Sequence, residues 1–131
     1  MKRTAINPVQ WSVSLGFDQG TLVDKHSRTL HCSGQTAMNH DGAPMHEGDM
    51  AAQLALTLDN LDAVLAAADM SMSNVVRLGI YTTDVDLLFQ HYGPLMARLA
   101  AAGVTPATTM LQVSRLAVPG QMIEIDATAV D

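Results

Sequence analysis

Two carboxylates near the end of the chain, Glu124 and Asp126, lie in a segment whose polar and apolar residues alternate. Alternation from Met122 to Val130 is typical of a half-buried strand, and it places both acids on the same face. A carboxylate held on a rigid strand can orient water or a polar ligand. The alternative is an ordinary solvated sheet face on which neither acid has a chemical role.

A second group with chemical potential, His31, Cys32 and Ser33, lies in a run of strand-forming residues. In a strand, His31 and Ser33 share one face and Cys32 points to the other. This geometry disfavours a Cys–His nucleophile pair, and no local acid completes a Ser–His arrangement. We therefore expect Cys32 to be a small buried residue.

The histidines do not form a compact metal-binding pattern; they are His26, His31, His40, His46 and His91. No two of them have the i, i+4 spacing of zinc ligands on a helix. The single cysteine leaves no partner for an intrachain disulfide and no cysteine-rich zinc site. We predict neither a metal nor a cofactor.

The elements that must position these residues follow from the spacing of apolar side chains. Short strands are predicted at 22–23 and 29–33, and longer ones at 75–82, 108–113 and 122–130. One helix should begin at an Asp49 cap and end near residue 68. A second, from Asp84 to Gly103, must bend or restart at Gly93-Pro94, because proline cannot continue a helix. Residues 1–20 are mixed in character and are expected to supply an entry segment, with Trp11 and Phe17 as its only large anchors.

This order of elements predicts a single α+β domain over residues 1–131, with one mixed sheet and both helices on one of its faces. The composition, 48% hydrophobic and 15% charged, is that of a globular chain with a real core. The second face of the sheet is then left without helices.

The charge balance argues against nucleic acid as a partner. The net charge is −6, and the seven Lys and Arg residues do not cluster, whereas phosphate binding depends on concentrated basic charge. No apolar run reaches membrane-spanning length, and no secretory segment follows Met1. The predicted location is the cytoplasm.

Several short segments resemble, in order and spacing, the RidA/YjgF family of enamine/imine deaminases. They are Gln19-Gly20, Ser33-Gly34-Gln35, Gln53 with Leu58-Asp59-Asn60, Pro106-Ala107, Leu116, Ile123-Glu124-Ile125 and Ala129-Val130. The resemblance runs from about Phe17 to Val130. It implies a chorismate-mutase-like fold and a homotrimer with ligand clefts between its subunits. Relatives have also carried endoribonuclease labels, which the acidic charge balance disfavours here.

The resemblance also implies roles for individual residues. Glu124 stands at the position thought to hold or activate the hydrolytic water, and it is the predicted catalytic residue. The predicted substrate-binding residues are Phe17, Ser33, Gln35, His91, Thr108 and Met110. Phe17 matches a position where deaminating relatives usually have tyrosine, so it keeps the aromatic wall and lacks the hydroxyl.

Thr108 is the main departure from the family pattern. Deaminating relatives carry an arginine directly after Pro-Ala, and its guanidinium grips the substrate carboxylate with two hydrogen bonds. Threonine offers one neutral hydrogen bond and no charge. Arg115 is seven residues further on, an odd offset that would reverse its face in an unbroken strand, so it is not assumed to substitute.

Three functions therefore remain open. The first is a RidA-like hydrolase of a reactive enamine or imine, with a specificity altered from simple 2-imino acids and with 2-iminopropanoate deamination weak or absent. The second is a trimer that binds a small neutral or cationic metabolite without turnover. The third is a purely structural trimer, which the retained Glu124 and Ser33 disfavour.

Overall fold

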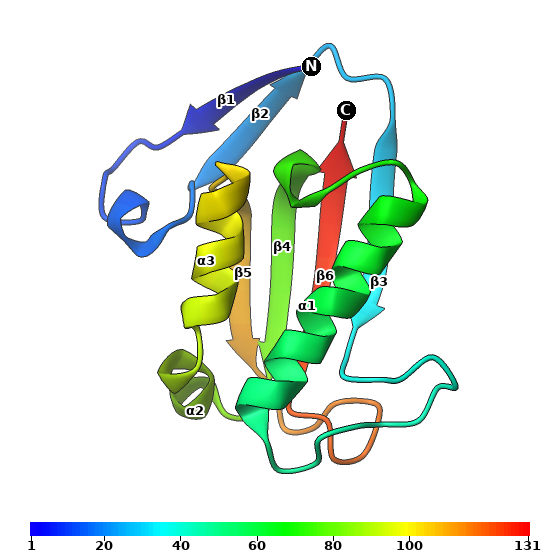
Figure 1. Ribbon diagram of the computed structural model, residues 1–131. Coiled ribbons are helices and arrows are strands. Elements are labelled where there is room, and N and C mark those ends of the chain that lie inside the picture. Colours follow the sequence, from blue (N-terminus) through cyan, green and yellow to red (C-terminus); the bar gives the residue numbers. More distant parts are fainter.

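A mixed four-stranded sheet carries the fold in the computed structural model, which describes residues 1–131. Its spatial order is β3–β6–β4–β5, with β6 antiparallel to both neighbours and β4 parallel to β5. The strands are β3 (Thr29–Gln35), β4 (Val75–Thr82), β5 (Ala107–Gln112) and β6 (Ile123–Val130). Figure 1 shows α1 (Met50–Ala67) and α3 (Gly93–Ala102) in front of one face of this sheet. The predicted α+β class and the one-sided placement of the helices are confirmed.

The first helix packs one apolar stripe into the core. The Asp49 side chain accepts a hydrogen bond from the amide of Ala52 at 3.0 Å, which caps the exposed start of α1. Its apolar stripe is fully buried and consists of Leu54, Leu58, Leu61 and Leu65. Each such side chain contributes about 1.5–3 kcal/mol when it is removed from water, so this stripe holds α1 against the sheet.

The second helical segment is divided, as the Gly93-Pro94 pair predicts. Asp84 caps α2 (Val85–Gln90), and α3 restarts at Gly93 with Pro94 in its first turn, where a missing amide hydrogen costs little. The last turn ends at Gly103, whose φ of 68° lies in the left-handed region that glycine adopts readily.

The N-terminal segment forms a ribbon of its own beside the main sheet. β1 (Lys2–Ile6) pairs antiparallel with β2 (Gly20–Asp24), and a short 3₁₀ turn, η1 (Val13–Leu15), lies between them. The predicted entry segment contains a strand that the predicted order of elements lacks, because β1 is too short to show alternation and is held by its pairing with β2. Trp11 is not a buried anchor either, since its side chain is 60% exposed.

The buried Asp18 ties this ribbon to the main domain. Its two carboxylate oxygens accept hydrogen bonds from Asn7 Nδ2 and Thr105 Oγ1, each at 2.7 Å. The amide of Asp18 also donates to the carbonyl of Thr105, at the approach to β5. These contacts fix the preceding residue, Phe17, beside the edge strand of the sheet.

The two faces of the sheet differ as the alternation in β6 predicts. The residues that face the helices are all buried: Ile123, Ile125, Ala127 and Ala129. The residues between them are only half-buried, and no helix covers them: Glu124, Asp126 and Thr128. We call this second side of the sheet the open face. None of the helices combines the length and apolar character that a membrane crossing requires.

Candidate functional site

The predicted site residues fall into two groups on opposite sides of the sheet. Thr108 and Met110 of β5 pair with Leu78 and Ile80 of β4, which are buried beneath the helices. Glu124 of β6 pairs instead with Tyr81, on the open face. Paired residues on adjacent strands share a face. Thr108 and Glu124 of one chain therefore cannot line the same cavity.

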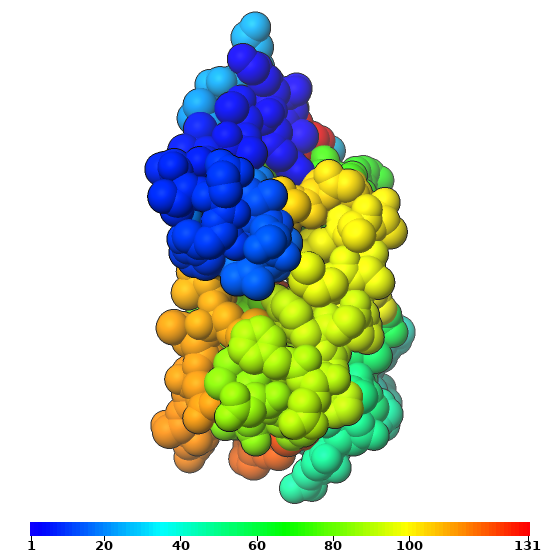
Figure 2. Space-filling model, turned by 90° about the vertical axis from the view of Figure 1, so that its left-hand side faces the viewer, coloured from blue at the N-terminus to red at the C-terminus, as the bar shows by residue number.

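The first group lines a cleft at the edge of β5, which we call the edge cleft. Its volume is about 480 Å³, and its walls are Ser14, Leu15, Phe17, Phe89, Tyr92, Met96, Thr108 and Met110. Figure 2 shows the side of the molecule where the N-terminal segment, the α2–α3 region and β5 meet around a hollow. Predicted residues from two distant parts of the sequence are thus brought together here: Phe17, and Thr108 with Met110 of β5.

Aromatic side chains gather at the edge cleft, although the chain has only five. Phe17 meets Trp11 edge to face with ring centroids 5.8 Å apart, and Phe89 meets Tyr92 in the same way at 5.7 Å. These two pairs come from different segments and flank the same cavity. Burial raises the pKa of the Tyr92 phenol, which keeps this hydroxyl neutral.

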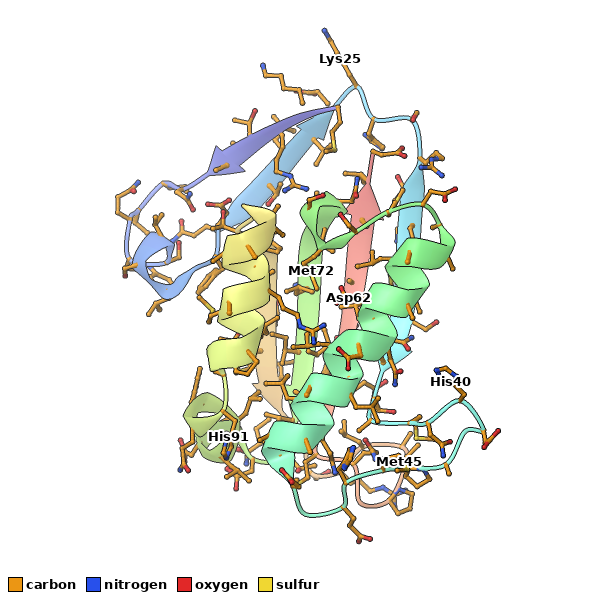
Figure 3. All side chains as sticks on the ribbon, in the orientation of Figure 1. Lys25, His40, Met45, Asp62, Met72 and His91 are labelled. Carbon is orange, nitrogen blue, oxygen red and sulfur yellow. The ribbon has the colours of Figure 1, made fainter.

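Three predicted binding residues lie outside the edge cleft: His91, Gln35 and Ser33. His91 ends α2 and does not line the cavity, whereas the next residue, Tyr92, does. Figure 3 shows His91 beside α2, far from His40 in the loop before α1. Gln35 lies at the end of β3, pairs with Ile125, and donates from Nε2 to the carbonyl of Ser33 at 3.1 Å.

The second group consists of Glu124 on the open face and Ser33, the neighbour of Gly34 in β3. A β-bulge between Cys32 and Gln35 sets Ser33 and Gly34 opposite a single residue of β6. The Glu124 carboxylate lies over Gly34, in space that any β-carbon at this position would fill. Gly34 thus lets a carboxylate rest against the edge strand β3, directly beside the exposed Ser33.

Asp126 has different surroundings from Glu124, although both lie on the open face. Its side chain leans toward β4 over Gly79, where a β-carbon would come within 2.6 Å of Oδ1. The negative charge of Asp126 raises the pKa of the Tyr81 phenol. The two acids therefore point in opposite directions: Asp126 contributes to a contact within the sheet, and Glu124 is turned toward the β3 edge.

Cys32 faces the core, as predicted, and its side chain is buried. Burial, with a smaller contribution from Asp126, raises the pKa of the thiol. A higher pKa leaves less of the reactive thiolate at neutral pH, so this position suits packing rather than nucleophilic chemistry. Nowhere do three His, Cys, Asp or Glu side chains gather as a metal site would require.

Neither arginine that could stand in for a cation at position 108 lies in the edge cleft. Arg77 is on the open face, where its guanidinium donates to Thr109 Oγ1 at 2.9 Å and to carbonyls of β4 and β5. Arg115 lines a separate cavity of about 500 Å³ formed mainly by the β5–β6 loop. Within one chain, the edge cleft thus has no positively charged side chain.

Several contributing residues could not be singled out from the sequence. The wall residues Ser14, Leu15, Phe89 and Met96 carry no motif, and the shortage of aromatic residues was the one available signal. Gln53, by contrast, is one of the residues that carry the family resemblance. It is fully buried on α1, its Nε2 donates to the carbonyls of His46 and Gly120, and its Oε1 accepts from the amide of Met122. It thereby fixes the start of β6 and the position of Glu124.

The chain matches a family model described as Endoribonuclease L-PSP over residues 17–131. Protein DfrA of Myxococcus xanthus is 37% identical over 131 residues, which cover 99% of this chain and 97% of that protein. The 2-iminobutanoate/2-iminopropanoate deaminase of Rattus norvegicus is 31% identical, over 87% of this chain and 79% of the deaminase.

Solved structures agree with this relationship. A Yersinia pestis protein of unknown function from the conserved Rid family, YyfB, superposes with a TM-score of 0.87 at 34% identity, over 100% of both chains. The YjgF gene product of Escherichia coli superposes with a TM-score of 0.70 at 29% identity, over 87% of each chain. Fold, order of motifs and relatives agree, and this chain is a member of the RidA/YjgF family.

Proposed function

We propose that this chain is a homotrimeric enamine/imine hydrolase in which Glu124 of one copy faces the edge cleft of the next. The observation that carries the proposal is the position of two groups on opposite sides of the sheet. The Glu124 carboxylate lies over Gly34 on the open face, whereas the edge cleft opens on the other side. A second copy packed against the open face could bring the two halves together. The relative named a 2-iminobutanoate/2-iminopropanoate deaminase supports the type of reaction.

A trimer would also cover surface that a single chain leaves exposed. Leu111 points from β5 to the open face and is 50% exposed, beside the half-buried polar residues of β6. An uncovered sheet face of this kind is typical of subunit contacts. Light scattering coupled to size exclusion should give about three times the 13.9 kDa of one chain.

The proposed reaction converts a C=N bond and one water molecule into a carbonyl group and ammonia. Glu124 accepts a proton from water as the water oxygen bonds to the imine carbon. The same carboxyl group returns this proton to nitrogen, which gives a carbinolamine. It then carries the hydroxyl proton to the same nitrogen as the carbonyl group forms, the C–N bond breaks, and ammonia leaves. Backbone groups near Met110 would hold the reacting end, and the aromatic walls of the edge cleft would hold the rest of the substrate.

Thr108 sets the expected specificity. A carboxylate that enters the edge cleft without a cation forgoes a charge-assisted hydrogen bond worth about 1.5–3 kcal/mol. The wild-type protein should therefore release ammonia from 2-iminopropanoate at least about tenfold more slowly than a relative with arginine at this position. The imine is generated in the assay by an amino-acid oxidase, and spontaneous hydrolysis is subtracted.

Thr108→Arg should recover part of this rate, and adding Glu124→Ala should abolish the gain. Thr29→Arg makes the same change of charge at the exposed start of β3, away from the edge cleft, and should gain nothing. A wild-type rate equal to that of the relative would contradict the role of Thr108. Full activity of Glu124→Ala would contradict the proposed catalytic role of Glu124.

A second candidate is a trimer that binds a metabolite without turnover. The observation that favours it is the edge cleft itself, which is mostly apolar and lacks charged residues. On this alternative, ligands bind in the edge cleft, and neither the wild type nor Thr108→Arg releases ammonia from any imine.

A further inference from the structure

The edge cleft has apolar walls and a volume larger than the methyl or ethyl chain of a simple 2-imino acid requires. Six of its eight wall residues are hydrophobic: Leu15, Phe17, Phe89, Tyr92, Met96 and Met110. A dry apolar cavity of about 150 Å³ is enough to hold a benzene ring. The edge cleft, at about 480 Å³, has room for a ring and the carbons that link it to a reacting group.

The serine and threonine side chains of the edge cleft have no free hydrogen-bond donor for a carboxylate. The Thr108 hydroxyl donates to the carbonyl of Pro106 at 2.9 Å, and the Ser14 hydroxyl donates to the carbonyl of Trp11 at 2.9 Å. Both hydroxyl protons are therefore already engaged. Against the walls that one chain supplies, an anion would lose its hydration without gaining a cation, and the net charge of the chain is −6.

The aromatic walls favour a flat ring in particular. Phe17 comes from the N-terminal segment, Phe89 from α2 and Tyr92 from the start of α3, so rings from separate segments line the cavity. A ring seated between them can adopt the edge-to-face contacts that aromatic pairs prefer. Met96 and Met110 supply flexible thioether side chains, which adapt to ring edges.

We propose that the edge cleft binds the aryl arm of an uncharged imine, one that carries no carboxylate next to its C=N carbon. That the ligand is an imine rests on the proposed hydrolase function. That it carries an aryl arm rests on the edge cleft alone. The proposal assigns the substrate to the chemical class of aryl-substituted neutral imines, and the product to the matching aryl ketone or aldehyde.

Three ketones that resemble products separate the two features of the ligand. Phenylacetone has the ring and no charge, phenylpyruvate has the ring and a carboxylate, and pyruvate has the carboxylate alone. Protein labelled with ¹³C at its methionine methyl groups is titrated with each. Met96 and Met110 report on the edge cleft, whereas Met45 and Met72 lie elsewhere, as Figure 3 shows for both.

Phenylacetone should shift the Met96 and Met110 signals and leave Met45 and Met72 unchanged. Phenylpyruvate should bind at least about tenfold more weakly, and pyruvate should not bind measurably. Phe17→Ala should weaken phenylacetone binding severalfold. Thr108→Arg should reverse the order of the two aromatic ketones, and Thr29→Arg should preserve the wild-type order.

Equal or tighter binding of phenylpyruvate to the wild type would overturn the proposal. So would the absence of any shift with phenylacetone, or shifts confined to Met45 and Met72. The wild-type comparison decides the matter even if Thr108→Arg does not fold. Phenylacetone binding without ammonia release from any imine would keep this proposal and refute the hydrolase function, so the two failures are distinguishable.

Discussion

The two sides of the β4–β5–β6 region contrast sharply in chemistry. On the helix side, β5 contributes Thr108 and Met110 to an apolar cleft whose walls carry no charge. On the open face, β4 and β6 present Arg77, Tyr81, Glu124 and Asp126. Adjacent residues of one strand thus belong to different environments. The contrast shows that residues predicted to form one site, such as Thr108 and Glu124, can lie on opposite faces of a sheet. Each face then holds one half of a site.

Substitutions of two adjacent β6 residues, Glu124 and Ile125, should differ most in their effect on the free energy of unfolding. Ile125 is fully buried against the helices, so Ile125→Ala should lower the free energy of unfolding by about 2–5 kcal/mol. Glu124 lies on the open face, and Glu124→Ala should change the free energy of unfolding by less than about 0.5 kcal/mol. Urea unfolding at one fixed protein concentration measures both values. Equal losses would mean that the faces are not distinct.

The glycine that accommodates Asp126 should show an intermediate effect. A β-carbon at Gly79 would come within 2.6 Å of Oδ1, so Gly79→Ala should cost about 1–3 kcal/mol of unfolding free energy. Asp126→Ala should relieve most of this cost in the double variant, which a double-mutant cycle detects as coupling. Additive losses would show that Asp126 does not occupy the space above Gly79.

The two tyrosines offer the smallest and most selective comparison, because each lies on a different side. Asp126 raises the pKa of Tyr81, whereas burial raises that of Tyr92. Removing the negative charge makes phenolate formation easier, so Asp126→Asn should lower the Tyr81 pKa and leave the Tyr92 pKa unchanged. Ultraviolet titration of the phenolates measures both. A shift of both tyrosines, or of neither, would contradict the assignment.

The sequence predicts most of the elements of this fold because their signals are local. The leucine stripe of α1 and the alternation in β6 each lie within a continuous segment, and Pro94 marks the break between α2 and α3. β1 escapes prediction because its five residues acquire a strand conformation only by pairing with β2. The exposure of Trp11 likewise depends on how the ribbon lies against the main domain.

The site is harder to predict because it depends on contacts between distant segments. The sequence identifies Glu124 and Thr108 as residues of interest, but their opposite orientation follows from the register of β4 with β5 and β6. Gly34 acquires its role only when the bulge in β3 brings it beneath Glu124. Phe89 of α2 and Tyr92 at the start of α3 both line the edge cleft, although the break between the two helices separates them.

The most direct test of a site shared between two copies is complementation between inactive variants. Glu124→Gln removes the proton-transfer group, and Thr108→Trp fills the edge cleft. The two variants are refolded together in equal amounts, and the trimer mass is checked by light scattering. Ammonia release is measured with phenylmethanimine, generated from benzylamine by an amine oxidase, or with 2-iminopropanoate, whichever the wild type hydrolyses faster.

If each site takes Glu124 from one copy and the edge cleft from the next, some sites in mixed trimers pair two intact halves. Random mixing makes about one site in four complete, so the mixture should regain roughly a quarter of the wild-type rate. Each variant alone should stay near the background rate. A mixture no more active than its two components, at an unchanged trimer mass, would contradict a site assembled from two copies.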